Sequence, residues 1–249
     1  MKRVDLISPI TKDTLNLLDI YEFDVNELKK ESYEKMVYVG EIIEWKAKEI
    51  LKGFNIDLKI RNFYAYILRE IMRNVPEHSE ASMYYLACYK NKNEVAFKVV
   101  DKGITIKESL NKNPRFNIYN DKSAVTFAIK PGVTRSYKRD PYRDDVWQNS
   151  GFGLYMVSSL MKRVGYFELK SGSGRIVVMK DRENDFMSIT KVAGTEVLII
   201  IDKRILINIP ETLKELSTKG SELSKNSNFS LYADIKTASQ ASTLIEDIL

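Results

Sequence analysis

The chain has 249 residues, of which 44% are hydrophobic and 29% are charged, a balance that excludes wholesale disorder. Its single cysteine, Cys88, excludes an internal disulfide and a cysteine-cluster metal site, and no apolar run approaches the roughly 18–20 residues that span a bilayer. The net charge of +5 is mildly basic, and the basic start "MKRVD" precedes no apolar stretch typical of a secretory signal, so we expect a cytoplasmic protein.

The first 30 residues are interpreted as an N-terminal extension with a short strand-like run, "RVDLI". Apolar residues at helical spacing predict a helix over about 33–51, which Gly53 closes. The same pattern predicts a second helix over about 61–75, and Pro76 marks its end.

Two strand-like runs, "ASMYYLACYK" and "EVAFKVVDK", flank "NKN" and predict a hairpin. The segment 103–148 reads as mostly irregular, and a connection of that length indicates a functional loop such as a lid. "LYMVSSLMKRV" predicts a third helix that Gly165 closes. "YFELK" and "RIVVMK" around "SGSG" predict another hairpin, "GTEVLIIID" predicts a last buried strand, and "RILINIP" is a candidate for one more.

This order of elements predicts an α+β fold, a two-layer α/β sandwich in which a mainly antiparallel mixed sheet carries its helices on one face. The expected domain covers residues 31–202, with a lid over about 104–150. A C-terminal extension, 203–249, is polar and ends in the amphipathic stretch "ASTLIEDIL".

Polar residues recur one turn apart in "LREIMRNVPEHS", which contains the only histidine of the chain, His78. At 100° per residue, Glu70 and Asn74 lie about 40° apart on one border of the apolar arc, whereas Arg69 and Arg73 face away from it. A carboxylate there can activate a water, and an amide oxygen can ligate a hard cation such as Mg²⁺. On spacing alone, the favoured interpretation is a polar rim that makes surface hydrogen bonds.

Three further short motifs contain residues that could contact a bound ligand. In "VVDKGITI", Asp101 ends a buried strand, and its carboxylate can accept a hydrogen bond from an exocyclic amine such as adenine N6, while Gly103 lets a ligand approach the backbone. In "QNSGFGL", Gly151 and Gly153 precede a helix whose N-terminus could cradle phosphates. In "GTEVLIII", the Thr195 hydroxyl could support Asp101 or a water beneath a base. Taken singly, these motifs are equally compatible with a strand-ending turn and a flexible loop end.

The order of the motifs is more informative than any one of them. E-x-x-x-N on a helix, D-x-G after a strand, a lid-length loop, G-x-G-L opening a helix and G-T before a last strand together resemble the GHKL ATPase superfamily over residues 31–202. That superfamily includes gyrase, the ninety-kilodalton heat-shock chaperone, histidine kinases and MutL, and the resemblance implies its Bergerat-type ATP-binding fold with ATP and Mg²⁺ as cofactors.

The resemblance also implies a role for each matching residue. Glu70 would be the water-activating general base, Asn74 the Mg²⁺ ligand and Asp101 the adenine-binding carboxylate. The remaining matches are Gly103 beside the base, Gly151, Gly153 and Leu154 in the phosphate loop, and Thr195 near the adenine edge. His78 resembles a histidine that ends this motif in the histidine-kinase and anti-sigma-kinase branches, and we interpret it as a structural or phosphate-side residue.

Two departures from the family pattern bear on the site. Thr105 stands where the second glycine of D-x-G-x-G is expected, and no Q-T-K segment supplies a distal lysine for the γ-phosphate. Arg135, Lys138 and Arg139 could supply that charge or could be solvated loop residues. The basic stretch "TRSYKRDPYRDDVW" that holds them is interrupted by three aspartates, so a solvated loop is favoured over nucleic-acid binding.

The expected function is a small stand-alone Mg²⁺–ATP-binding protein with slow ATPase activity. Its lid would respond to ATP or ADP as a conformational switch for association with a second copy or a partner protein. Because the sole histidine lies in the nucleotide motif, a self-contained histidine kinase is excluded. Two alternatives stay open, an anti-sigma-type serine protein kinase and an ATP-sensing regulatory subunit that does not hydrolyse ATP.

Overall fold

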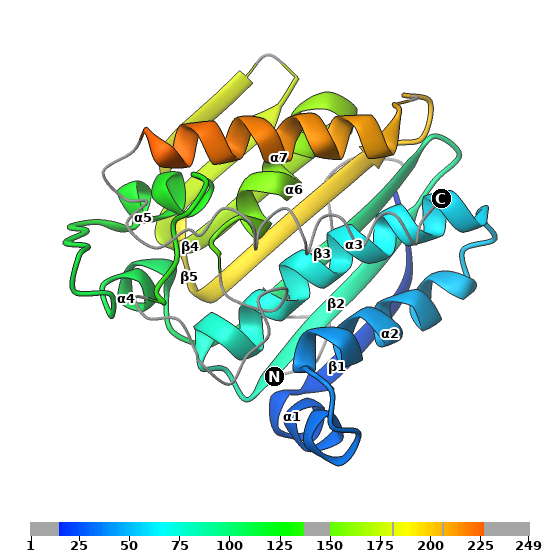
Figure 1. Ribbon diagram of the computed structural model, residues 1–249, viewed down its shortest axis with the longest axis horizontal. Coiled ribbons are helices and arrows are strands. Elements are labelled where there is room, and N and C mark those ends of the chain that lie inside the picture. The colour runs from blue at the N-terminus through cyan, green and yellow to red at the C-terminus, as the bar shows by residue number, and fades with distance from the viewer. Residues whose placement is uncertain (1–14, 137–149, 181, 206, 227–249) are drawn as a thin grey trace.

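The computed structural model describes residues 15–136, 150–180, 182–205 and 207–226. Its described strands form one five-stranded sheet in the order β1-β2-β3-β5-β4 (Figure 1). The strands are β1 (Asn16–Asp24), β2 (Met83–Lys90), β3 (Glu94–Asp101), β4 (Gly165–Met179) and β5 (Arg182–Asp202). Every neighbouring pair of these strands is antiparallel, which agrees with the mainly antiparallel sheet that we expected, and none of the described pairs is parallel.

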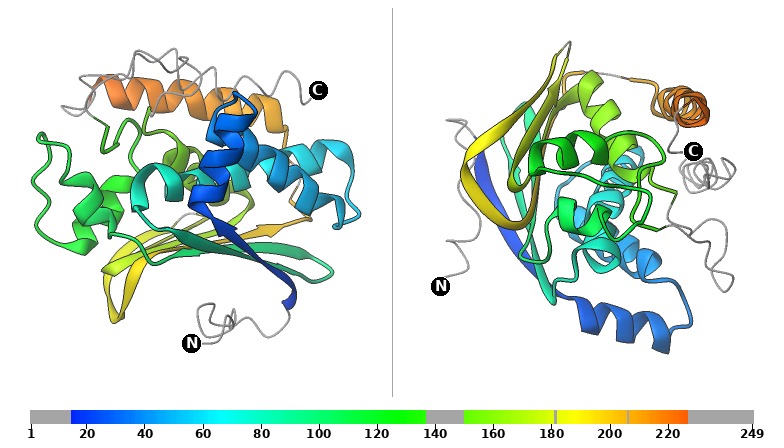
Figure 2. Two further views of the ribbon diagram at one scale, coloured as in Figure 1. Left: turned by 90° about the horizontal axis from the view of Figure 1, so that it is seen from below. Right: turned by 90° about the vertical axis from the view of Figure 1, so that its left-hand side faces the viewer.

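The helices lie on one face of this sheet, which confirms the predicted two-layer α+β architecture (Figure 2). They are α1 (Val25–Glu34), α2 (Val39–Lys52), α3 (Leu58–Asn74), the π-helical turn η2 (Val75–Ser79), α4 (Ile106–Leu110), α5 (Asp121–Ala128), α6 (Gly153–Val164) and α7 (Ile209–Lys225). Within the described parts of the chain, no helix combines the length and the apolarity needed to cross a membrane.

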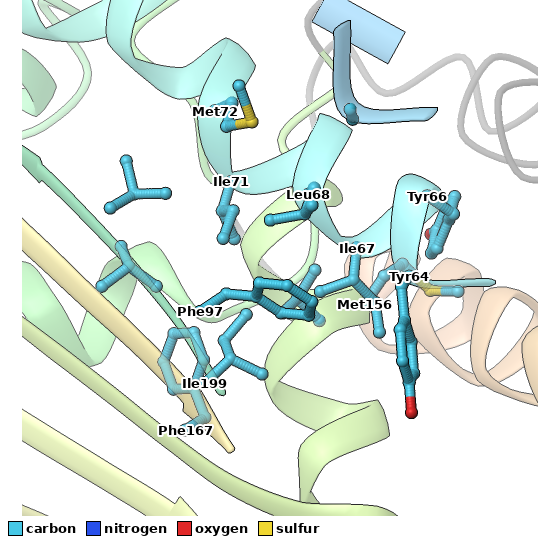
Figure 3. Close-up of a cluster of buried hydrophobic side chains, with 14 of the residues drawn as sticks. Tyr64, Tyr66, Ile67, Leu68, Ile71, Met72, Phe97, Met156, Phe167 and Ile199 are labelled. Carbon is cyan, nitrogen blue, oxygen red and sulfur yellow. The ribbon is translucent and has the colours of Figure 1, made fainter. Parts of the chain in front are cut away.

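Between the two layers lies the hydrophobic core, which Figure 3 shows in part. Helix α3 contributes Ile67, Leu68, Ile71 and Met72, and these side chains face Phe97, Phe167 and Ile199 of the sheet and Met156 of α6. Burying a side chain of this size contributes about 1.5–3 kcal/mol each, so the core fixes α3 and α6 on the sheet. These two helices carry half of the predicted site residues.

The N-terminal region differs from the prediction in two ways. Asn16–Asp24 forms the edge strand β1, which pairs with β2, so this part of the expected extension belongs to the sheet. The expected helix over 33–51 is broken, because Met36 adopts a positive φ of 52° between α1 and α2. The cap at Gly53 is confirmed. The strand-like run "RVDLI" lies outside the described residues.

The second predicted helix is present as α3 and begins earlier, at Leu58, because the Asp57 side chain accepts the Ile60 N–H at 3.0 Å and caps it. Pro76 does not end the helical path. It occupies the first turn of η2, where its missing N–H costs little, and the turn ends at Glu80 with a left-handed φ of 58°.

The segment 103–148 is less irregular than predicted, because it contains α4 and α5. Thr105 and Glu108 form a capping box at the start of α4, and the Asn120 side chain accepts the Ser123 N–H at the start of α5. Helix α5 packs on β4 through Asp121, whose carboxylate accepts both the N–H and the hydroxyl of Ser173 at 2.9 Å. The lid region is therefore anchored at its described end.

The predicted hairpin around "SGSG" is wrong. Residues 171–174 form an irregularity within the continuous strand β4, and the hairpin connects β4 to β5 after Met179. The glycines allow the strand to pass close to α5, since a Cβ on Gly172 or Gly174 would collide with Asp121. "GTEVLIIID" is confirmed as the second half of β5.

At the C-terminal end, β5 stops at Asp202 and α7 begins at Ile209, so the described residues between them hold no further strand of the kind proposed for "RILINIP". Helix α7 packs on α6, where the Tyr155 hydroxyl donates to the Leu216 carbonyl at 3.2 Å. The amphipathic stretch "ASTLIEDIL" lies outside the described residues.

Candidate functional site

A cleft opens between α3 and η2, the strands β3 and β5, the described lid and the start of α6, and it measures about 790 Å³ including its open mouth. Six of the predicted site residues line it together, although they come from four separate segments: Asn74, Asp101, Gly151, Gly153, Leu154 and Thr195. His78 and Arg135 also line the cleft, whereas Glu70 and Gly103 lie just outside the lining.

Asp101 lies at the buried end of β3 and is only 4% exposed. Burial raises the pKa of its carboxyl to about 6, against the opposing effect of the Gly103 N–H, which donates to Oδ1 at 2.8 Å. Gly103 is needed for close packing rather than for contact with the cleft, because a Cβ there would collide with the Ser79 carbonyl. Asp101 thus presents a desolvated acceptor to the cleft.

Thr195 lies directly across from Asp101 in the β3–β5 register and across from Ser171 in the β4–β5 register. The Ser171 hydroxyl donates to the Gly194 carbonyl at 2.9 Å and accepts the Ile106 N–H of α4 at 2.8 Å. The sequence analysis missed Ser171, since a serine in "KSGSG" carries no signal of its own. Only the pairing of β4 with β5 brings it to the site.

Asn74 ends α3, and its Nδ2 donates to the Glu70 carbonyl at 2.8 Å. This bond orients the amide so that Oδ1 is the side-chain atom available to a ligand in the cleft. A single amide oxygen fits Mg²⁺, which takes oxygen ligands and commonly completes its shell with phosphate oxygens and waters. In the described part of the chain, no group of three or more histidine, cysteine, aspartate or glutamate side chains could hold a metal ion by itself.

Glu70 is 7% exposed and is held by its neighbours. Its Oε1 accepts hydrogen bonds from both Nε and Nη2 of Arg69, at 3.0 and 2.8 Å, and lies 4.0 Å from Nη1 of Arg73. Its Oε2 points toward the start of α6, 2.8 Å from the position that a Cβ would take on Gly153. The predicted base therefore lies behind Gly153, the predicted phosphate-loop glycine, and is not part of the cleft lining.

Arg69 and Arg73, which the helical wheel places away from the apolar arc of α3, are nevertheless buried, at 2% and 6% exposed. Arg69 also donates to Glu44 of α2 at 2.9 Å, and Arg73 donates to Glu77 at 3.2 Å. Burial alone would lower the pKa of Arg69, but Glu70 and Glu44 raise it above its ordinary value. Helix α2 covers this side of α3, and its carboxylate makes the burial of a guanidinium possible.

The glycine-rich start of α6 has an open N-terminus, because Phe152 at the N-cap makes no side-chain capping bond. Gly151 has a positive φ of 73°, and a Cβ there would lie 2.6 Å from the Val133 carbonyl, so glycine is required at this turn. The first backbone N–H groups of a 12-residue helix thus end at the cleft beside Leu154. Such an arrangement suits an anionic group.

Arg135 connects the lid to η2, since its Nη1 donates to the His78 carbonyl at 3.2 Å and to Glu80 Oε1 at 3.1 Å. Lys138 and Arg139, the other cations considered for the lid, lie outside the described residues. Thr105, which stands where the resemblance led us to expect a second glycine, caps α4 by accepting the Glu108 N–H at 3.2 Å. The threonine at this position therefore has a structural role of its own at the start of α4.

No protein-family model matches the chain, and no curated protein matches it closely enough to indicate a relationship.

Proposed function

We propose that this cleft binds ATP with Mg²⁺ and that the protein is a small ATPase with slow turnover. One observation carries the proposal: a buried carboxylate, an oriented amide and an open helix N-terminus line the same cleft. These three groups suit the amine of a purine, a hard cation and phosphate oxygens respectively. The order of their motifs along the chain resembles the GHKL superfamily.

Each end of the nucleotide has a candidate partner. Asp101 would accept a hydrogen bond from the exocyclic amine at the closed end of the cleft, while the N–H groups at Gly153 and Leu154 would bind phosphate oxygens. Asn74 Oδ1 would hold Mg²⁺, which neutralises phosphate charge when bound. Glu70 would orient or deprotonate a water near the γ-phosphate through Oε2, because Arg69 occupies Oε1.

A second function, ATP sensing without hydrolysis, is favoured by the position of Glu70. Its carboxylate is bonded to Arg69 and does not line the cleft. A general base must come within hydrogen-bond reach of the water that it activates, so turnover would require Glu70 to reorient. Phosphate release by the wild-type protein in excess Mg²⁺–ATP separates the two: steady turnover supports an ATPase, and tight binding without turnover supports a sensor.

The described part of the lid would serve as the nucleotide-controlled switch for association with a second copy or a partner. Helix α4 is held to β4 by the Ile106 N–H, which donates to Ser171 at 2.8 Å, and to η2 by the Ser109 hydroxyl, which donates to the His78 carbonyl at 2.9 Å. A nucleotide that stabilises these contacts would increase the fraction of molecules in which the lid is docked on η2 and β4. Limited proteolysis of residues 104–136 with and without ATP tests this, and an unchanged cleavage pattern would count against it.

Calorimetry with Mg²⁺–ATP on the wild type and on Asp101→Asn tests the binding proposal. We expect the wild type to bind in the micromolar range, which corresponds to about −8 kcal/mol, and Asp101→Asn to lose most of that affinity. Asp202→Asn is the matched control, since Asp202 pairs with Arg204 at the far end of β5. If the wild type binds neither ATP nor ADP, the proposed function is wrong.

A further inference from the structure

Ser171 lies behind Thr195, away from the cleft, and is 1% exposed. Its Oγ lies within hydrogen-bond distance of three groups. These are the Gly194 carbonyl at 2.9 Å, the Ile106 N–H at 2.8 Å and the Thr195 Oγ1 at 3.2 Å. A hydroxyl has one proton to donate and two lone pairs to accept with, so these contacts use its full capacity.

Counting protons settles the direction of the third bond. The Gly194 carbonyl can only accept, so the single Ser171 proton is donated there. The Ile106 N–H can only donate, so it takes one lone pair of Ser171 Oγ. The bond between Ser171 and Thr195 must therefore use the proton of Thr195, although the distance alone allows either direction.

As a result, the Thr195 hydroxyl has no proton left for a ligand. Thr195 lines the cleft beside Asp101, its cross-strand neighbour, and an ionised carboxylate is also an acceptor only. The side-chain groups at this end of the cleft thus present lone pairs together. A ligand that offers another acceptor to the same place would leave both partners unsatisfied, which is costly in a desolvated site.

We propose that Ser171 is a specificity-determining positioning residue, which holds the Thr195 hydroxyl as an acceptor and so selects bases with an amino group at this edge over bases with a carbonyl. The preferred ligand class is a 6-aminopurine nucleotide, and the rejected class is the 6-oxopurines. This inference rests on the proposed nucleotide binding and adds the residue that sets the base preference.

The first experiment needs no variant. At pH 8, the affinity of the wild type is measured by calorimetry for ATP, purine riboside triphosphate and inosine triphosphate, which carry an amine, a hydrogen and a carbonyl at the tested position. We expect affinity to fall in that order, with ATP at least about tenfold tighter than inosine triphosphate. Inosine triphosphate binding as tightly as ATP would overturn the inference.

The second experiment is the Ser171→Ala variant, in which Thr195 is free to turn its proton toward the cleft. We expect the ratio of ATP to inosine triphosphate affinity to fall by roughly three- to tenfold, because the hydroxyl can then donate to the carbonyl. Ser158→Ala is the matched control, since that buried hydroxyl donates to the Tyr155 carbonyl on α6. Its ratio should equal that of the wild type.

A double-mutant comparison separates the positioning role from a general loss of structure. In a Thr195→Val background the hydroxyl is absent, so adding Ser171→Ala should leave the affinity ratio unchanged. An equal fall in both backgrounds contradicts the inference. If the wild type prefers ATP and Ser171→Ala keeps the wild-type ratio, the inference is wrong while the proposed function stands. If the wild type binds no nucleotide, both are wrong.

Discussion

Arg69 donates two hydrogen bonds to the same oxygen of Glu70, its neighbour on α3, at 3.0 and 2.8 Å, in a part of the protein that excludes water. The pair commits Oε1 of Glu70 and leaves Oε2 facing Gly153. A carboxylate held in this way is positioned rather than mobile, and any base function of Glu70 therefore depends on the arginine beside it.

Replacing Glu70 with glutamine should abolish ATP turnover while retaining nucleotide binding, because an amide cannot take up a proton and the cleft lining does not include this side chain. Phosphate release and calorimetry on the same preparations would measure the two effects. Glu49→Gln is the control, since Glu49 pairs with Lys52 on the exposed side of α2. Turnover at the wild-type rate in Glu70→Gln would remove this residue from the catalytic role.

Removing the arginine should destabilise the whole protein. We expect Arg69→Ala to lower the free energy of unfolding by about 3–5 kcal/mol, because Glu70 and Glu44 would lose the cation that compensates their charges. Urea denaturation followed by circular dichroism measures the change. Arg204→Ala, which removes an exposed pair with Asp202, should leave the transition midpoint in place. An equally small effect of Arg69→Ala would show that the buried pairing contributes little.

The ionisation of Asp101 should make stability depend on pH. Burial raises the pKa of Asp101 from 3.8 in the unfolded chain to about 6 in the folded protein. Between these two pH values the folded protein keeps a proton on Asp101 that the unfolded chain releases. The associated stability is present below about pH 4 and is lost as pH rises through about 6, a difference of up to about 3 kcal/mol. We expect the unfolding free energy of the wild type to fall relative to that of Asp101→Asn over this range.

Denaturant titrations of both proteins between pH 4 and pH 7 measure that difference. Asp121→Asn provides a comparison in which the contact between the lid and β4 is changed while Asp101 is kept as in the wild type. A wild-type curve parallel to the Asp101→Asn curve across the whole range would mean that the carboxyl is better solvated than its burial indicates.

Close packing of Gly103 against η2 should make even a methyl group costly. A Cβ at this position would meet the backbone of Ser79 and Ala81, which cannot move without disturbing η2, so we expect Gly103→Ala to destabilise the protein by about 1–3 kcal/mol. Gly53→Ala is the matched control, since its Cβ would find only the Ile50 carbonyl at 3.6 Å. Thermal unfolding of the two variants should therefore differ clearly, and equal midpoints would contradict the packing argument.

Local patterns in the sequence were sufficient to predict the helices and strands that contain most of the candidate site residues. The β2–β3 hairpin, α3 and α6 follow from periodicity and turn residues within a few positions of each other. They bring Asn74 and Asp101 to one cleft, as the order of the motifs suggested. Helix α4 could have been predicted too, because Thr105 and Glu108 form a capping box in adjacent sequence.

Other features depend on partners that are distant in the chain. Arg69 is buried against Glu44 from a different helix, and the helical wheel of α3 alone shows only that this arginine lies off the apolar arc. The break at Met36, the pairing of β1 with β2 and the continuity of β4 through its glycines are likewise decided by neighbouring elements. Strand pairing in particular is non-local, and no short window of sequence reports it.

By itself, then, the sequence predicted the candidate site residues and most of the helices and strands that contain them. Capping, periodicity and turn preferences act within a few residues, so a short stretch of sequence is enough to read them. Tertiary structure alone decided how those groups are oriented. The pairing of Arg69 on α3 with Glu44 on α2 and the contact of Thr195 on β5 with Ser171 on β4 both join separate segments of the chain. Hydrogen-bond donors and acceptors are satisfied through space, and their polarity becomes readable only once every neighbour has been placed.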